Sequence, residues 1–217
     1  MAILITKHNL SRHNETLEKV YRFRHRFFVH HKKWAMLAKS DEREIDEFDT
    51  PEAVHIVGLD NSGDISTYTR LLATTGPHLL SEVYPELLQG NPEPIGPDIW
   101  EWTRAAINPF KRDSDKGASR IKGEFYAAVV EACLHLGIRA LLVEAHPGLI
   151  TSAIDVGFHT RPLALPTEYG GEPVVPFLCE VTEQTLPRTR EVFGLSSPVL
   201  RVDEIGVEAP ALERLAQ

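Results

Sequence analysis

A long helical segment lies between two strand-like segments in the second half of the sequence. Residues 118–136 place apolar side chains at helical spacing, and Gly137 follows where the helix should end. The runs IWEWTRAAI (99–107) and RALLVEA (139–145) on either side read as strands. A helix that connects two strands is typical of an α/β fold, so we expect a sheet with helices packed on it.

The rest of the chain continues this alternation. The other strand-like runs are 2–6, 53–60, 65–74, 161–166 and 173–181, and the other helix-like runs are 14–33, 78–88 and 147–156. The runs 53–60 and 65–74 are separated by a short turn that contains Asn-Ser-Gly, which predicts a hairpin and therefore some antiparallel pairing. The sequence predicts an α/β fold with a mixed twisted sheet flanked by helices, in a single domain over residues 1–217.

Composition and charge exclude several classes of protein. A formal net charge of −8 does not favour nonspecific binding to nucleic acid or to an anionic membrane. Cys133 and Cys179 are too few for a disulfide framework, and the ten histidines show no metal-ligand spacing. The N-terminus lacks a leader pattern, and no apolar run approaches the roughly 20 residues that cross a bilayer. We expect a cytoplasmic protein without a metal, nucleic-acid or membrane partner.

Charged residues occur at positions where burial is expected. Arg24 falls inside the apolar stripe of the first helix, so either its charge reaches water or it is paired inside the protein. Glu101 and Arg104 lie in the strand-like run 99–107. In a regular strand they would point to opposite faces, whereas a β-bulge of one residue would bring them to the same side. They either form structural ion pairs or belong to a reactive site.

Further charges surround the predicted hairpin. Asp46 and Asp49 precede its first strand, and they either hold a cationic group or are solvated loop acids. Arg70 lies in the second strand, on the face that alternation gives to Tyr68 and Leu72. It either pairs with a neighbour at a sheet edge or supports a site.

The segment KRDSDKGASR (111–120) lies at the start of the long helix. Free N–H groups near Gly117, with Lys111 and Arg112 close by, could bind a phosphate, or the segment is a plain capped helix. The sequence has no Walker A loop, dinucleotide fingerprint or nucleophile elbow.

Taken together, these positions resemble the acyl-homoserine-lactone synthase (LuxI-type autoinducer synthase) family. The marker residues occur in the family's order and at near-family spacing: Arg24, Phe28, Trp34, Asp46, Asp49, Arg70, Glu101 and Arg104. The run RLLATTGPHLLSEVYPELL (70–88) is also similar to the family, whereas beyond residue 107 the likeness is mostly one of fold. The resemblance implies an acyltransferase-like (GNAT-type) three-layer sandwich.

The resemblance also implies a reaction. S-adenosylmethionine and an acyl thioester, carried by CoA or by acyl carrier protein, give an N-acyl-homoserine lactone and methylthioadenosine, with no further cofactor. Glu101 is the implied general base, supported by Arg70 and Arg104. The implied S-adenosylmethionine site comprises Arg24, Phe28, Trp34, Asp46, Asp49 and Arg104. The implied acyl-donor site lies where strands 99–107 and 139–145 splay apart, and comprises Trp102, Thr103, Val143, Lys111, Arg112 and Gly117.

Two departures from the family pattern bear on the acyl donor. Val143 stands where members that make 3-oxo-acyl signals often carry Thr, so a 3-oxo preference is not expected. The segment 147–157 has no Lys or Arg, whereas a docking face for an acidic carrier protein should be basic, which favours an acyl-CoA donor. The competing hypotheses are a GNAT-type N-acyltransferase that acylates another amine, and a non-catalytic sensor of acyl thioesters.

Overall fold

The computed structural model describes residues 1–109 and 115–202, with the backbone alone for residues 115–119. Its strands are β1 (Ala2–Ile5), β2 (Val54–Leu59), β3 (Ile65–Ala73), β4 (Ile99–Ile107), β5 (Ala140–Ala145), β6 (His159–Pro162), β7 (Thr167–Tyr169), β8 (Glu172–Glu180) and β9 (Leu200–Arg201). Its α-helices are α1 (Asn14–Arg24), α2 (Leu79–Glu82), α3 (Asp115–Leu136), α4 (Gly148–Asp155) and α5 (Thr185–Phe193). No helix in the described ranges is long and apolar enough to cross a membrane.

The strands form one mixed sheet in the order β6-β8-β5-β4-β3-β2-β1-β9, with β7 paired to β8. The β4–β5 and β1–β9 pairs are parallel, and the other pairs are antiparallel. The β2–β3 hairpin turns over Asp60, whose side chain accepts the N–H groups of Ser62 and Asp64, and over Gly63 at φ 78°. These features confirm the predicted mixed sheet and hairpin.

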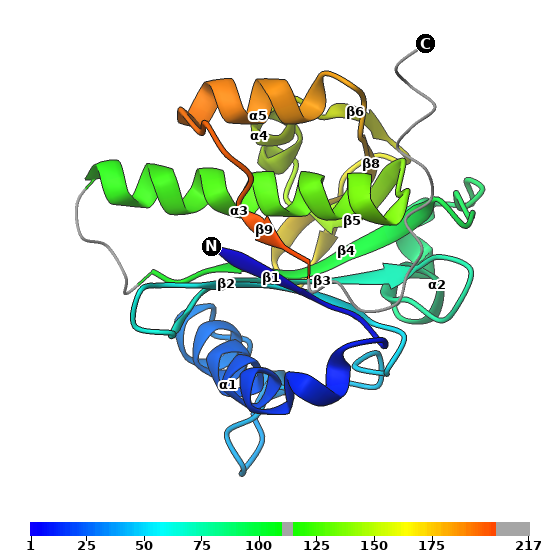
Figure 1. Cartoon of the computed structure of the whole chain (residues 1–217). Helices are drawn as coiled ribbons and strands as arrows, with labels where there is room; N and C mark the ends of the chain where they lie inside the picture. Colours follow the sequence, from blue (N-terminus) through cyan, green and yellow to red (C-terminus); the bar gives the residue numbers. More distant parts are fainter. Residues whose placement is uncertain (110–114, 203–217) are drawn as a thin grey trace.

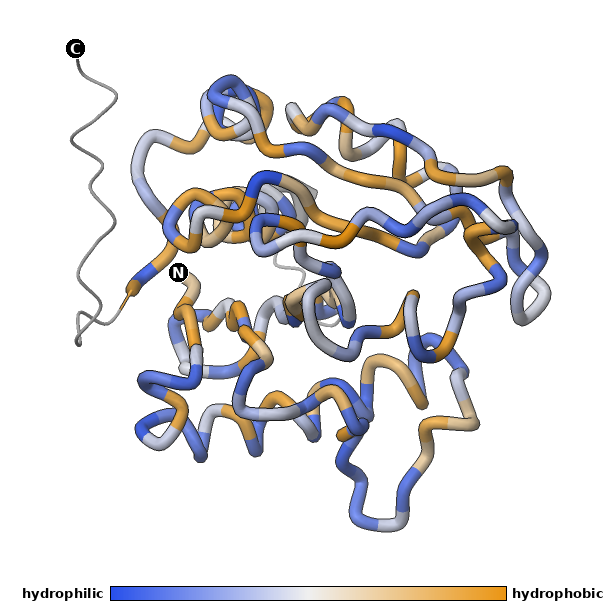
Figure 2. The backbone as a smooth tube through the Cα atoms, turned by 90° about the vertical axis from the view of Figure 1, so that its right-hand side faces the viewer, coloured by the Kyte–Doolittle hydropathy of each residue, from blue (hydrophilic) through white to orange (hydrophobic). Residues whose placement is uncertain are grey.

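Helices cover both faces of the sheet, which gives three layers (Figure 1). Helix α1 lies on one face, while α3, α4 and α5 lie on the other. Alternation along β2 shows the division: Ile56 packs in the core that contains α3, and Val57 packs in the core that contains α1. Figure 2 shows hydrophobic residues concentrated along the central strands, with hydrophilic residues interspersed along α1.

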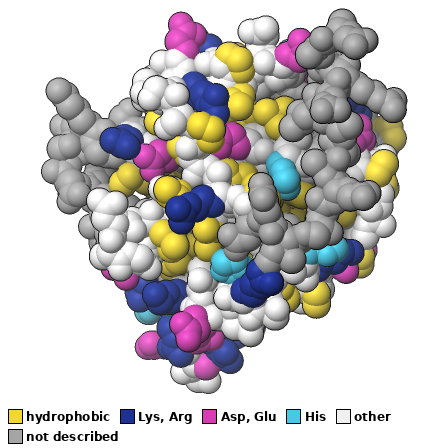
Figure 3. Space-filling model, viewed as in Figure 1, with side chains coloured by type: hydrophobic (Ala, Val, Ile, Leu, Met, Phe, Trp, Pro, Cys, Tyr) yellow, Lys and Arg dark blue, Asp and Glu magenta, His cyan; other side chains and the backbone are white. Residues whose placement is uncertain are grey.

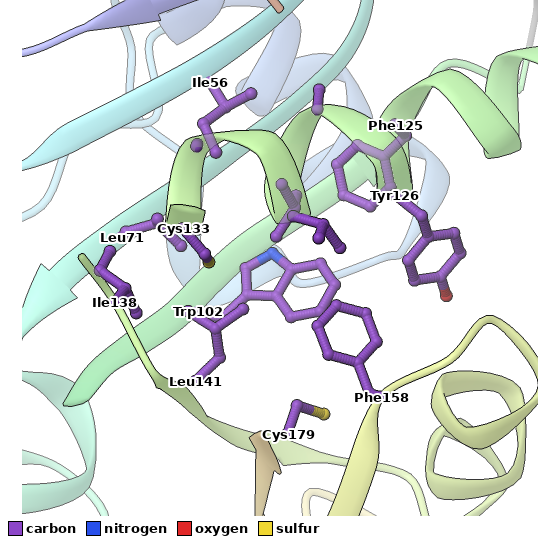
Figure 4. Packing of buried hydrophobic residues seen from close by; sticks show 14 of the residues in the cluster. Ile56, Leu71, Trp102, Phe125, Tyr126, Cys133, Ile138, Leu141, Phe158 and Cys179 are labelled. Carbon is purple, nitrogen blue, oxygen red and sulfur yellow. The ribbon is translucent and has the colours of Figure 1, made fainter. Parts of the chain in front are cut away.

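The core on the α3 face is built around Trp102 of β4. Its ring packs against Phe125 and Tyr126 of α3 and against Phe158, with ring centroids about 6 Å apart (Figure 4). Trp102 Nε1 donates to Thr69 Oγ1 at 2.7 Å, so the polar edge of this buried ring is satisfied. This core holds β4 against α3 through one face of the sheet, and the charged residues lie on the other face, which α1 covers.

Several elements differ from the sequence predictions. The first predicted helix is two segments, because α1 is followed by a π-helical stretch at His25–His31. Helix α3 begins at Asp115, three residues before the predicted start. Helix α5 and strands β7 and β9 were not predicted: α5 has Pro187 in its first turn and many charges, and the two strands are only 3 and 2 residues long.

Two irregularities of β4 shape the site. Strand β4 pairs with β3 as Arg70↔Thr103 and Tyr68↔Ala106, so β4 has one more residue than β3 between these pairs. This is a β-bulge of the kind that brings Glu101 and Arg104 to the same side, and Arg104 within it has φ 55°. Strand β4 pairs with β5 only from Ile99 to Glu101. The two strands therefore separate beyond Glu101, as predicted.

Candidate active site

A network of three arginines and three carboxylates lies on the α1 face of the sheet, and it consists of Arg24, Arg70, Arg104, Glu44, Asp46 and Asp49. Arg24 ends α1 and has no exposed side-chain surface. Its Nε donates to Glu44 Oε2 and its Nη1 to Asp49 Oδ1, both at 2.6 Å. The charge of Arg24 is therefore paired inside the protein, and the alternative in which it reaches water is wrong.

Arg70 of β3 holds the centre of the network. Its Nη1 and Nη2 donate to the two oxygens of Asp46 at 2.5 and 3.0 Å, a bidentate pair, and its Nη1 also lies 2.8 Å from Asp49 Oδ1. Its Nε donates to Thr103 Oγ1 at 3.1 Å. Arg70 thus connects the acidic loop, residues 43–49, to strands β3 and β4.

Arg104 joins the network from the bulge. Its Nη2 donates to Asp46 Oδ2 at 2.8 Å, and its Nε to Glu44 Oε2 at 3.2 Å. The backbone of Arg104 is in the left-handed region, which residues other than glycine adopt only when surrounding contacts hold them there. The bulge reverses the alternation of β4, so Arg104 and Ala106 face α1 as Glu101 and Thr103 do. Glu101 and Arg104 therefore share a face, as the bulge predicted.

Two carboxylates of the network, Asp49 and Glu44, are held ionised. Burial opposes ionisation of Asp49, but Arg24 and Arg70 outweigh it and hold the pKa of Asp49 well below its ordinary value. In the same way, burial is outweighed by Arg24 and Arg104, and the pKa of Glu44 is lowered. Asp46 and Asp49 are paired acids, so the alternative in which they are solvated loop acids is wrong.

Glu101 lies beside this network but is held by the main chain. Its Oε2 accepts the N–H of Leu79 at 2.8 Å, and its Oε1 accepts the N–H of Leu80 at 2.7 Å. These are the first N–H groups of α2, where the helix has free donors. Burial raises the pKa of Glu101, against these two hydrogen bonds and against His78 and Arg70. Its carboxyl group is an acceptor with raised proton affinity, and it is not engaged in a direct ion pair with Arg70 or Arg104.

Two aromatic rings border the network. Phe28 and Trp34 are stacked, with ring centroids 5.1 Å apart and planes 20° from parallel. The guanidinium carbon of Arg104 lies 5.7 Å from the centroid of the Phe28 ring. Phe28 is buried, whereas Trp34 is 46% exposed. These two rings, here called the aromatic wall, therefore comprise one ring fixed against the network and one ring open to solvent.

The predicted acyl-donor residues are less closely grouped. Trp102 and Val143 pack in the core on the α3 face, whereas Thr103 contacts Arg70 on the opposite face. Gly117 lies near the start of α3, and Lys111 and Arg112 lie outside the described residues. The described part of the chain contains no group of three or more His, Cys, Asp or Glu that could hold a metal ion.

Sequence reasoning missed three features of the site. Glu44 bridges Arg24 and Arg104, and it lies two residues before Asp46 in a segment that the sequence marks only by its many charges. Glu144 of β5 is a second carboxyl near Glu101, with a buried Oε1, and an acid in the apolar run ALLVEA carries the same signal as Glu101 in its strand. The N–H donors from Leu79 and Leu80 have no side-chain signal at all.

A model of the autoinducer synthase family matches residues 7–159 of this sequence, which includes all the marker positions. The chain belongs to the autoinducer synthase family. The predicted family and the predicted class of enzyme, an acyltransferase, are confirmed. The isovaleryl-homoserine lactone synthase of Bradyrhizobium diazoefficiens is 29% identical to this autoinducer synthase over 205 residues, which cover 94% of this chain and 88% of that protein.

Solved structures agree. The CoA-dependent acyl-homoserine lactone synthase BjaI, in a structure with SAM and isopentyl-CoA, superposes with a TM-score of 0.87 at 28% identity and covers 96% of each chain. The CoA-dependent acyl-homoserine lactone synthase MesI has a TM-score of 0.83 at 30% identity, over 92% of this chain and 98% of that chain. An acyl-CoA N-acyltransferase from Pseudomonas aeruginosa, only 14% identical, has a TM-score of 0.55 and shares the fold alone. The predicted acyltransferase-like sandwich is confirmed.

Proposed function

We propose that this autoinducer synthase transfers an acyl group from a thioester to the amine of S-adenosylmethionine and then closes the lactone, with residues 1–217 acting as one domain in the cytoplasm. The observation that carries the proposal is the placement of Glu101 at the point where β4 and β5 separate, beside the network of Arg70 and Asp46. The proposed base and the proposed cation-binding network would then lie next to the point where β4 and β5 separate.

In the proposed reaction, Glu101 accepts a proton from the ammonium group of S-adenosylmethionine, directly or through water. The free amine then attacks the thioester carbonyl, and N–H groups of the separated strands stabilise the oxyanion. Collapse of this intermediate breaks the carbon–sulfur bond of the thioester, and the thiol leaves with the second proton of the amine. The reaction uses the two substrates and no further cofactor.

Lactone formation is an internal displacement. The carboxylate of the acylated substrate attacks its own γ-carbon, the bond from that carbon to the sulfonium sulfur breaks, and methylthioadenosine leaves. Holding the substrate folded is the main contribution that a protein can make to such a step. Arg24 and Arg104 are the proposed partners of the carboxylate, and Nη2 of the buried Arg24 has no hydrogen-bond partner among the described residues.

The cationic substrate is proposed to bind between the network and the aromatic wall. The carboxylate of Asp46 is 13% exposed, whereas the Asp49 side chain has no exposed surface, so Asp46 is the acid that a ligand can reach. Phe28 and Trp34 offer π faces to the sulfonium and a stacking surface to the adenine.

We propose acyl-CoA as the donor. Two structural relatives are described as CoA-dependent, and α4 and its flanks at 147–157 carry no Lys or Arg. On the face seen in Figure 3, basic and acidic side chains are interspersed, without a continuous basic area among the described residues. The proposed phosphate contacts, Lys111, Arg112 and Gly117, belong to the segment that leads into α3.

The test is product analysis by mass spectrometry. The purified chain is incubated with S-adenosylmethionine and a panel of straight, branched and aromatic acyl-CoA thioesters. We expect an acyl-homoserine lactone and methylthioadenosine in equal amounts. Acylation of another amine without methylthioadenosine would identify an ordinary N-acyltransferase, and binding without turnover would identify a sensor.

A further inference from the structure

A second carboxyl group lies on the same face of the sheet as Glu101. In the parallel register Glu101 is opposite Leu142, and alternation along β5 gives Glu144 the same side as Leu142. That side packs against α2, because Leu142, Ile99 and Leu80 form one apolar cluster. Glu144 is thus at the position where β4 and β5 have just parted, directed toward the carboxyl of Glu101.

Glu101 lies close enough to Glu144 to affect its ionisation: it raises the pKa of Glu144 by electrostatic repulsion and by side-chain hydrogen bonding. Oε1 of Glu144 is buried and has no hydrogen-bond donor in the described part of the chain, whereas both oxygens of Glu101 accept a main-chain N–H. An ionised Glu144 would leave a buried carboxylate oxygen without a donor, which is costly. A neutral Glu144 needs only an acceptor, and Glu101 supplies one.

We propose that Glu101 and Glu144 share one proton at neutral pH, and that Glu144 is the neutral acid that donates to the Glu101 carboxylate and positions it as a base. The inference rests on the proposed role of Glu101 in the synthase reaction. Carboxylates keep about four acceptor sites, so Glu101 can accept from Leu79, Leu80 and Glu144 together.

The neighbouring groups favour a proton on Glu144 and a negative charge on Glu101. Burial and the neighbouring Glu101 raise the pKa of Glu144 well above its ordinary value. Burial also raises the pKa of Glu101, but its two main-chain donors act against the rise. The ionisable groups that face the pair from the adjoining elements are Arg70 of β3, His78 before α2, Tyr84 after α2 and Glu93 of the following connector. Arg70 and a protonated His78 favour the anion on Glu101, whereas Glu93 disfavours one on Glu144.

The proposal assigns Glu144 a distinct effect on catalysis. Its hydrogen bond keeps Glu101 ionised in a buried site, so that Glu101 can accept a proton from the substrate at neutral pH. Loss of the donor would raise the pKa of Glu101 further. The acid limb of the pH profile of kcat/KM, which reports the base in the free enzyme, would then move to higher pH.

The first experiment detects the shared proton without reference to activity. Infrared spectra of the whole chain at neutral pH are compared for wild type, Glu144→Gln and Glu180→Gln, a control glutamate on the neighbouring strand β8. We expect the carbonyl stretch of a protonated carboxylic acid in the wild type and in the control, and its loss in Glu144→Gln. Its absence from the wild type, or its persistence in Glu144→Gln, would overturn the proposal even if the chain proved not to be a synthase.

The second experiment separates positioning from a merely structural role. Glu144→Gln keeps a neutral hydrogen-bond donor, whereas Glu144→Leu removes it. Thermal unfolding verifies that both variants are folded. We expect the acid limb of the kcat/KM profile of Glu144→Leu to shift upward by about one pH unit, which is a tenfold loss of kcat/KM at pH values below the limb. The acid limb of Glu144→Gln should stay near that of the wild type. An unchanged limb in folded Glu144→Leu, or an equal shift in both variants, would refute the assignment.

Discussion

Arg24 and Asp49 form an ion pair from which solvent is fully excluded. Arg24 Nη1 donates to Asp49 Oδ1 at 2.6 Å, and neither side chain has exposed surface. The same Asp49 oxygen lies 2.8 Å from Arg70 Nη1, and Asp49 Oδ2 accepts the N–H of Asp46 at 2.9 Å. Asp49 therefore fixes the acidic loop against α1 and β3, and its first role is structural.

Replacing Asp49 with Asn should destabilise the fold. The change leaves Arg24 and Arg70 buried with less compensating charge, and removal of one partner of a buried pair costs about 3–5 kcal/mol. Urea denaturation at pH 7 measures the loss. The matched control is Asp41→Asn, which breaks a pair with Arg43 that lies in solvent and should leave the midpoint unchanged. Equal midpoints for the two variants would show that the buried pair does not stabilise the protein.

Stability should depend on pH in the acid range. The folded-state pKa values of Asp49 and Glu44 lie below their ordinary values, so the unfolded chain binds protons first as the pH falls. Their contribution is fully present above the ordinary values of about 4, and it is lost as the pH falls below them. Denaturation at successive pH values should show this decline in wild type and a weaker one in Asp49→Asn. The pKa values of Glu101 and Glu144 are raised, so the contribution of these two groups to stability has the opposite pH dependence. It is present at low pH and is lost as the pH rises above the ordinary value of about 4.3.

The β-bulge in β4 shows which part of the site can be anticipated from the sequence. Two opposite charges in IWEWTRAAI, three residues apart, pointed to a bulge as one arrangement that would place them on the same side, because regular alternation puts them on opposite faces. The partners of those charges were not predictable in the same way. Arg104 pairs with Glu44, 60 residues distant, and Glu101 with the main chain of α2, 22 residues distant. Such contacts depend on how the loops pack and leave no periodic pattern.

The charged segment at residues 34–52 is a part of the site that the sequence did not predict. Residues 34–52 lack a hydrophobic period, so the sequence predicts only a loop, yet this loop supplies every carboxylate of the network. Its order comes from ion pairs and from Phe48, which is buried beside Leu72 and Leu79. Helix α5 was missed for a related reason, since its fully buried residues are two threonines, Thr185 and Thr189, and its apolar residues are only partly buried.

Glu101→Gln should remove most of the synthase activity from a folded protein. The amide keeps the shape of the side chain but cannot accept the substrate's proton, and a general base contributes about 10²–10⁴-fold. Initial rates of methylthioadenosine release should fall by that factor at saturating substrates, with circular dichroism used to verify folding. A Gln variant with near-wild-type turnover would remove Glu101 from the role of base.

Asp46→Asn should weaken S-adenosylmethionine more than the acyl donor. Asp46 is the partly exposed acid of the network, and its carboxylate is the one proposed to contact the cationic substrate. Loss of one charge beside a cationic ligand is expected to cost about 1 kcal/mol or more, roughly fivefold in affinity. Calorimetric titration with each substrate separately measures the effect. Glu47→Gln, at the exposed neighbouring position, is the control, and a loss confined to acyl-CoA would reverse the assignment of Asp46.

The donor proposal yields a direct comparison. An acidic carrier protein docks best on a basic surface, and the segment 147–157 offers no Lys or Arg. We therefore expect the purified chain to use medium, branched or aromatic acyl-CoA thioesters without carrier protein. Neutralising Lys111 and Arg112 would not separate the two donors, because the phosphates of CoA also require cations.

The decisive measurement supplies the same acyl group on CoA and on acyl carrier protein and determines kcat/KM for each. We expect the CoA thioester to be at least as good a substrate as the carrier-bound form. If the carrier-bound form is preferred by more than about 10²-fold, roughly 2.7 kcal/mol of transition-state stabilisation, the CoA proposal fails. Basic residues of the segment 111–122 would then be the leading docking site, since this segment carries five Lys and Arg residues.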